Sequence, residues 1–128
     1  MTNTSTERII QIHRSQKEFF LSGETLDITF RKRMLRKLSD AIESWEEKLA
    51  SALWEDLHKS YEEAYLTEIS IVKAEIRHHI HKIGKWARKR AIPTPVKLFP
   101  SRSHIVKEPL GCSLIISPWN YPVQLLLN

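Results

Sequence analysis

The stretch of sequence that decides the fold lies near the end of the chain and reads Leu114-Ile115-Ile116-Ser117-Pro118-Trp119-Asn120-Tyr121-Pro122. Its first three residues form a continuous apolar run, which is typical of a strand buried on both faces. Pro118 ends this strand, and Pro122 suits the first turn of a helix, where its missing N–H costs nothing. The stretch therefore predicts a strand, a tight turn and a helix. Trp119 and Asn120 fall on the turn, beyond the carboxyl end of the strand, where open α/β sheets bind their ligands.

A layer of helices is predicted upstream of this stretch, because apolar residues recur there at intervals of three and four. We expect the first helix to end at Ser22-Gly23 and the second to break near Ser44. The apolar pattern of the third helix runs to Trp86, and the prolines from Pro93 onwards are expected to end that helix. The three helix starts are marked by capping residues, namely Ser5 or Thr6, Thr25 or Asp27, and Ser60 with Glu63 as a capping box.

The composition changes abruptly after the helices, because all six prolines lie from Pro93 onwards. Prolines this dense favour an extended connector. Residues 102–107 alternate loosely between polar and apolar, as an edge strand does. We therefore divide the chain into a helical layer (1–92), a proline-rich connector with an edge strand (93–110), and the beginning of an α/β sheet (111–128).

The bulk composition limits the class of protein. The chain has 128 residues, of which 41% are hydrophobic and 27% charged, as in an ordinary globular domain. The first residues lack the pattern of a signal peptide, and no apolar stretch is long enough to span a bilayer. A single cysteine allows no internal disulfide and fits a reducing compartment, so we expect a cytoplasmic location.

Two further motifs accompany the Pro-Trp-Asn turn. Glu108-Pro109-Leu110-Gly111 precedes the predicted strand, and Trp54-Glu55-Asp56-Leu57-His58-Lys59-Ser60 is followed by Ala64-Tyr65 and a long helix. From about Arg8 onwards the chain resembles the NAD(P)-dependent aldehyde dehydrogenase superfamily, in particular its class 3 branch, which acts on fatty and aromatic aldehydes. The resemblance implies an α/β parent fold. This chain would supply the mostly α N-terminal part, an edge strand, and the truncated start of a Rossmann-like dinucleotide-binding domain.

The resemblance also implies a site and a reaction. The parent would oxidise aldehydes to carboxylates with NAD or NADP, through a thiohemiacetal on a cysteine. Asn120 matches the asparagine whose side-chain N–H helps to hold the substrate oxygen as it becomes negative. Ser117, Pro118 and Trp119, together with Asn120, match the segment along the nicotinamide ribose. Local sequence alone favours the interpretation of Asn120 as a turn residue, since asparagine favours turns; the surrounding motif favours the catalytic role.

In the family the cysteine nucleophile and the glutamate general base lie far downstream, so the 128-residue chain alone is predicted to be inactive. The resemblance implies a homodimer, and the apolar strand and tail predict self-association of the isolated chain. An alternative of a different class stays open, namely a non-catalytic helical interaction module. It explains the long amphipathic helices but not the Pro-Trp-Asn turn.

Other candidate sites are less specific. Cys112 is expected to be a small buried residue of the strand and not the nucleophile. His78 and His81 share a helix face, but two histidines without a third ligand predict no metal site. The basic residues between Lys82 and Arg90 suit a helix C-terminus and solvent. We therefore expect no nucleic-acid partner, although the net charge is +5.

Overall fold

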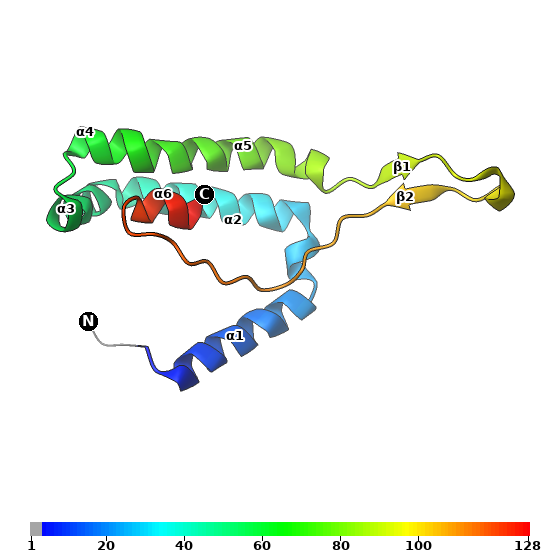
Figure 1. Cartoon of the computed structure of the whole chain (residues 1–128), viewed down its shortest axis with the longest axis horizontal. Coiled ribbons are helices and arrows are strands. Elements are labelled where there is room, and N and C mark those ends of the chain that lie inside the picture. Colours follow the sequence, from blue (N-terminus) through cyan, green and yellow to red (C-terminus); the bar gives the residue numbers. More distant parts are fainter. Residues whose placement is uncertain (1–3) are drawn as a thin grey trace.

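The structure, a computed structural model, describes residues 4–128. Residues 1–3, the start of the predicted helical layer, lie outside the described residues. Two helical arms, residues 28–57 and residues 61–86, lie side by side and run in opposite directions, with a β hairpin projecting from one end (Figure 1). The elements are α1 (Thr6–Leu21), η1 (Glu24–Leu26), α2 (Ile28–Ser44), α3 (Glu46–Leu57), α4 (Tyr61–Ala64), η2 (Tyr65–Ile69), α5 (Ser70–Trp86), β1 (Arg90–Ile92), η3 (Val96–Leu98), β2 (Ser103–Ile105) and α6 (Pro122–Leu127).

The helix starts follow the predicted caps. Ser5 Oγ accepts a hydrogen bond from the backbone N–H of Arg8, and Ser60 Oγ accepts one from Glu63. At the start of α2, Asp27 accepts from two backbone N–H groups, at 3.1 and 2.9 Å. Each cap satisfies donors that a helix leaves without a partner in its first turn. The predicted break near Ser44 is confirmed, because α2 ends there and α3 begins at Glu46.

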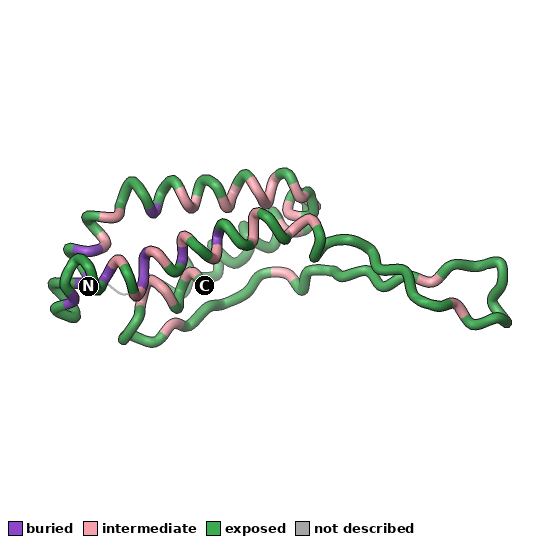
Figure 2. Tube along the Cα trace, turned by 90° about the horizontal axis from the view of Figure 1, so that it is seen from above, coloured by how far each residue is buried: buried purple, intermediate pink, exposed green. Residues whose placement is uncertain are grey.

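The core lies between the arms and extends to α6. Its larger cluster consists of Ile42, Ile69, Val72 and Ile76, with Leu127 of α6 packed against it. A second cluster consists of Ala50, Leu53 and Ala64, and Val123 of α6 packs against that one. Most of the chain outside these clusters is exposed, as Figure 2 shows. The short helix α6 is therefore fixed by two apolar residues one turn apart, each in contact with a different cluster.

The β hairpin pairs β1 with β2 in antiparallel register, with Ala91 opposite His104. The edge strand predicted within residues 102–107 is confirmed at Ser103–Ile105. Its partner β1 was not predicted, because residues 90–92 were assigned to the end of the helical layer. Thr94 Oγ1 accepts a hydrogen bond from the backbone N–H of Ser103 at 2.9 Å, which closes the hairpin beyond the strands.

The strand predicted at Leu114–Ile116 is wrong for this chain. These residues have no regular structure, and Leu114 and Ile116 are 87% and 84% exposed. A buried parallel strand needs neighbours that pair its backbone groups, and no segment within residues 4–128 pairs with this one. Cys112, which was expected to be buried in that strand, is exposed for the same reason. Among the described residues, no helix combines the length and the apolar character that crossing a bilayer requires.

Candidate functional site

The predicted site residues lie together on one turn that leads into α6. Ser117 Oγ donates a hydrogen bond to the carbonyl of Pro118 at 3.2 Å, and Trp119 is 86% exposed. The side chain of Asn120 is also exposed. The helix predicted after the turn is confirmed, with Pro122 in its first turn. The structure thus brings all four residues to one exposed turn, and their roles stay predictions.

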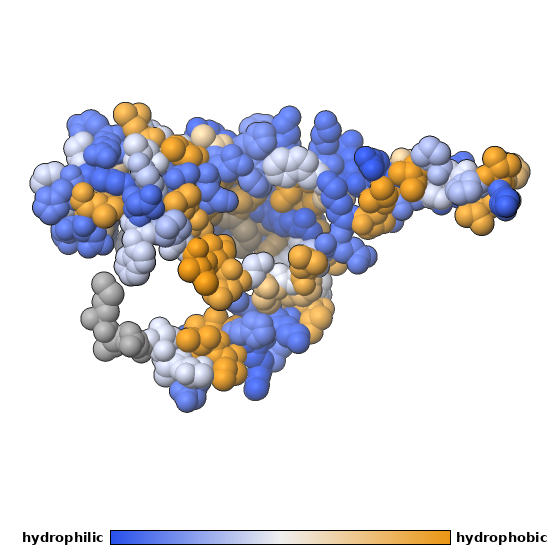
Figure 3. All heavy atoms as spheres, in the orientation of Figure 1, coloured by the Kyte–Doolittle hydropathy of each residue, from blue (hydrophilic) through white to orange (hydrophobic). Residues whose placement is uncertain are grey.

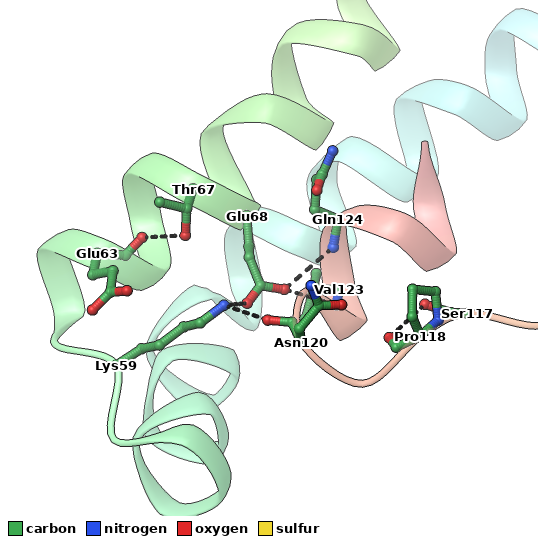
Figure 4. Close-up of polar contacts among 9 residues, drawn as sticks. All are labelled: Lys59, Glu63, Thr67, Glu68, Ser117, Pro118, Asn120, Val123 and Gln124. Carbon is green, nitrogen blue, oxygen red and sulfur yellow. Dashed lines mark hydrogen bonds and ion pairs between the residues drawn. The ribbon is translucent and has the colours of Figure 1, made fainter.

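Lys59 holds this turn from the helical layer. Its Nζ donates a hydrogen bond to the backbone carbonyl of Asn120 at 2.9 Å, and it lies 4.0 Å from the centre of the Tyr121 ring. The same Nζ is 2.6 Å from Oε1 of Glu68 (Figure 4). The ammonium therefore contacts a carboxylate, a carbonyl and an aromatic face at once, all of which attract a cation.

Glu68 completes the attachment on the other side of the turn. Its Oε2 accepts hydrogen bonds from the backbone N–H groups of Val123 at 2.8 Å and Gln124 at 3.3 Å. These belong to the first turn of α6, whose own N-cap residue Tyr121 makes no side-chain cap. A carboxylate near a helix N-terminus is favourable because the free N–H groups carry partial positive charge. Glu68 thus caps α6 from another element.

Local structure explains how Lys59 and Glu68 reach the turn. His58 ends α3 in the left-handed region, at φ 55°, and Ser60 caps α4, so Lys59 is the only residue between a helix end and a helix cap. Glu68 lies in η2, a π-helical turn in which the N–H of Ser70 donates to the carbonyl of Tyr65. Such turns insert one extra residue into a helix and occur often at functional sites.

Both residues are buried, and neither was among the site residues predicted from the sequence. The side chain of Glu68 is 0% exposed and that of Lys59 is 9% exposed. A signal was available, because Ala64, Glu68, Val72 and Ile76 recur every four residues, which puts a glutamate on the buried face of the helix. Because buried carboxylates are rare unless they are paired, this spacing predicts a cationic partner for Glu68.

A second ionic cluster lies elsewhere between the helical arms. Tyr61 Oη donates to Oε1 of Glu46 at 2.7 Å, and Lys73 Nζ is 3.4 Å from Oε2 of the same carboxylate. The hydrogen bond to the carboxylate raises the pKa of Tyr61, because it stabilises the protonated phenol. Residues 4–128 contain no group of three or more side chains placed to bind a metal ion.

Comparison with known proteins gives the family. The family model described as "Aldehyde dehydrogenase family" matches residues 1–128. The chain belongs to the aldehyde dehydrogenase family. It is 46% identical over 112 residues to 4,4'-diaponeurosporen-aldehyde dehydrogenase of Staphylococcus aureus, a match that covers 88% of this chain and 24% of that protein.

Relatives of class 3 confirm the predicted branch. The chain is 30% identical over 122 residues to aldehyde dehydrogenase family 3 member F1 of Arabidopsis thaliana, covering 95% of this chain and 25% of the relative. It is 36% identical over 121 residues to the dimeric NADP-preferring aldehyde dehydrogenase of Canis lupus familiaris, covering 94% and 27%. The chain thus spans about a quarter of the length of these relatives.

A solved structure supports the fold. The substrate-bound state of Staphylococcus aureus AldH superposes with a TM-score of 0.89 at 43% identity, over 98% of this chain and 27% of that one. The helical layer and the two-stranded hairpin are therefore part of an aldehyde dehydrogenase α/β fold. The sequence predicted that parent fold and the helical layer, but only one of the two strands.

Proposed function

We propose that the protein containing this chain oxidises aldehydes to carboxylates with NAD or NADP, and that Asn120 holds the substrate oxygen. Family membership supports the reaction class, and the relatives named above are aldehyde dehydrogenases. The observation that carries the role of Asn120 is its two-sided environment. Its backbone carbonyl is bonded to a buried lysine, whereas its side chain is exposed.

This environment suits the chemistry. When a cysteine thiolate from another part of the protein attacks the aldehyde carbon, negative charge develops on the aldehyde oxygen. A neutral amide N–H stabilises that charge without forming an ion pair that would hinder the later departure of hydride. A donor of this kind is effective only if it is already in place before the charge forms. The hydrogen bond from Lys59 to the Asn120 backbone would hold the asparagine in place before the charge forms.

The turn also fits the proposed cofactor wall. Pro118, Trp119 and Asn120 are exposed and follow one another directly, so they offer a continuous surface to a ligand. We propose that Ser117 to Asn120 lie along the nicotinamide ribose. When bound, the dinucleotide accepts the hydride. The canine relative is named NADP-preferring, and NAD and NADP both remain candidates for this protein.

We further propose a cytoplasmic homodimer. One relative is named dimeric, and the tip of the β hairpin carries exposed apolar side chains, with Val96 89% and Phe99 84% exposed. Hydrophobic residues gather at this far end of the hairpin in Figure 3. Exposed apolar groups at the end of a projecting hairpin favour contact with a second copy. The alternative of a non-catalytic helical module leaves the family match and the held turn without explanation.

Substitution of Asn120 tests the proposed role in the complete product of the gene that encodes residues 1–128. We expect Asn120→Ala to lower kcat for aldehyde oxidation by about 10²–10³-fold, measured as aldehyde-dependent formation of NADH or NADPH. Asn128→Ala is the matched control, because Asn128 is also exposed but follows α6. An Asn120→Ala enzyme as fast as this control would refute the role. Turnover by the 128-residue chain alone would refute its predicted inactivity.

A further inference from the structure

The turn that carries Asn120 is held at two points by one ion pair. Lys59 binds the carbonyl of Asn120 itself, and Glu68 binds the backbone N–H groups of Val123 and Gln124. The contacts join residues that are 55 to 61 positions apart in the sequence. The turn is thus clamped immediately before and immediately after Tyr121 and Pro122, whereas Ser117 to Trp119 have no such attachment to the helical layer.

From this geometry we infer that Lys59 and Glu68 are positioning residues that fix the direction of the Asn120 amide. This inference rests on the proposed function of Asn120. The bond from Lys59 fixes the peptide plane between Asn120 and Tyr121, and hence the backbone from which the Asn120 side chain projects. Glu68 fixes the first turn of α6, against which that peptide is set. Neither residue would touch the substrate.

The opposite charges of Lys59 and Glu68 determine which groups hold the turn. Glu68 has one oxygen for Lys59 and the other for α6, so its carboxylate serves both attachments. A buried carboxylate without these partners would be costly, as would a buried ammonium without Glu68. Each group is therefore a direct partner of the other, at 2.6 Å, while it also holds the turn. Apolar contacts of Val123 and Leu127 anchor α6, but they do not reach Asn120.

Kinetics of the complete gene product test the inference. Lys59→Met keeps much of the apolar stem and removes the donor. We expect kcat to fall by about 10- to 100-fold, since a small misplacement of a reacting group can cost about 10²-fold, with little change in KM for NAD or NADP. Lys73→Met is the matched control, because Lys73 also pairs with a glutamate between the helical arms but lies away from the turn. Its kcat should be unchanged.

A double variant separates positioning from general damage. If Lys59 acts only through Asn120, then Lys59→Met combined with Asn120→Ala should be no slower than Asn120→Ala alone. A double variant slowed by the product of the two single effects would overturn the inference, as would a Lys59→Met enzyme as fast as Lys73→Met. Glu68→Gln, which keeps an acceptor but loses the charge, should slow kcat in the same non-additive way and serves if Lys59→Met fails to fold.

NMR of the same protein, selectively labelled with ¹⁵N, gives a readout that does not depend on turnover. We expect Lys59→Met to shift the side-chain amide signals of Asn120 and the backbone amide signal of Tyr121, and Lys73→Met to leave both in place. Unchanged Asn120 signals in Lys59→Met would overturn the inference. If the unmodified protein oxidises no aldehyde, the proposed function fails, and these signals still decide whether Lys59 orients Asn120.

Discussion

Replacing Ile69 by alanine tests whether the small core holds the layer and α6 together. Ile69 is 0% exposed, where η2 meets α5, and belongs to the cluster against which Leu127 of α6 packs. Alanine removes three carbons, and at about 0.8 kcal/mol for each one the lost burial amounts to roughly 2.4 kcal/mol. The cavity adds to this cost, because the neighbouring branched side chains of Ile42 and Val72 relax only partly, so we expect a total of about 3–4 kcal/mol.

Urea unfolding of the 128-residue chain, followed by circular dichroism, measures this loss. With a slope of about 1–3 kcal/mol per molar urea, the midpoint should fall by about 1–4 M. Protein concentration must be the same for all variants, because association shifts apparent stability. Ile69→Val should cost only about 0.5–1.5 kcal/mol.

Leu66→Ala is the matched control within the same π-helical turn. Leu66 is 65% exposed, so its loss should change the free energy of unfolding by no more than about 0.5 kcal/mol. If Ile69→Ala costs as little as Leu66→Ala, the cluster around Ile69 does not hold the helical arms together, and the assignment of the core is wrong.

Two further predictions concern acid and self-association. Hydrogen bonds from the backbone N–H groups of Phe30 and Thr29 lower the pKa of Asp27. The Asp27 cap therefore stabilises the folded chain fully at pH values above the pKa of the unfolded chain, about 3.9. This stabilisation is lost as the pH falls through the lower pKa of the folded chain. Acid unfolding curves should therefore show a loss in the unmodified chain that is absent from Asp27→Ala, and identical pH dependence would contradict this. We also expect the isolated chain to self-associate through its exposed apolar segment, and light scattering should show smaller particles for Leu114→Lys with Ile116→Lys. A strictly monomeric unmodified chain at high concentration would exclude self-association.

The sequence predicted those features whose causes are local. A serine or aspartate oxygen caps the helix that begins next to it, so the sequence identified Ser60 and narrowed the other two caps to a pair of candidates each. The structure selects Ser5 over Thr6 and Asp27 over Thr25. The helix after Pro122 was predictable for the same reason, because proline limits its own backbone and that of the residue before it. The family, too, could be named from short motifs, and comparison with known proteins confirmed it.

The tertiary structure decided everything that needs a distant partner. Leu114–Ile116 has the composition of a buried strand but forms none, because a strand exists only where neighbours pair its backbone. Glu68 lies within an apolar helical pattern, and nothing next to it in the sequence shows that Lys59 and α6 would satisfy its two oxygens. The sequence alone thus placed Asn120 on a turn. Only folding brought the lysine that holds its carbonyl to within 2.9 Å, because the free energy of a buried charge depends on which groups surround it in space.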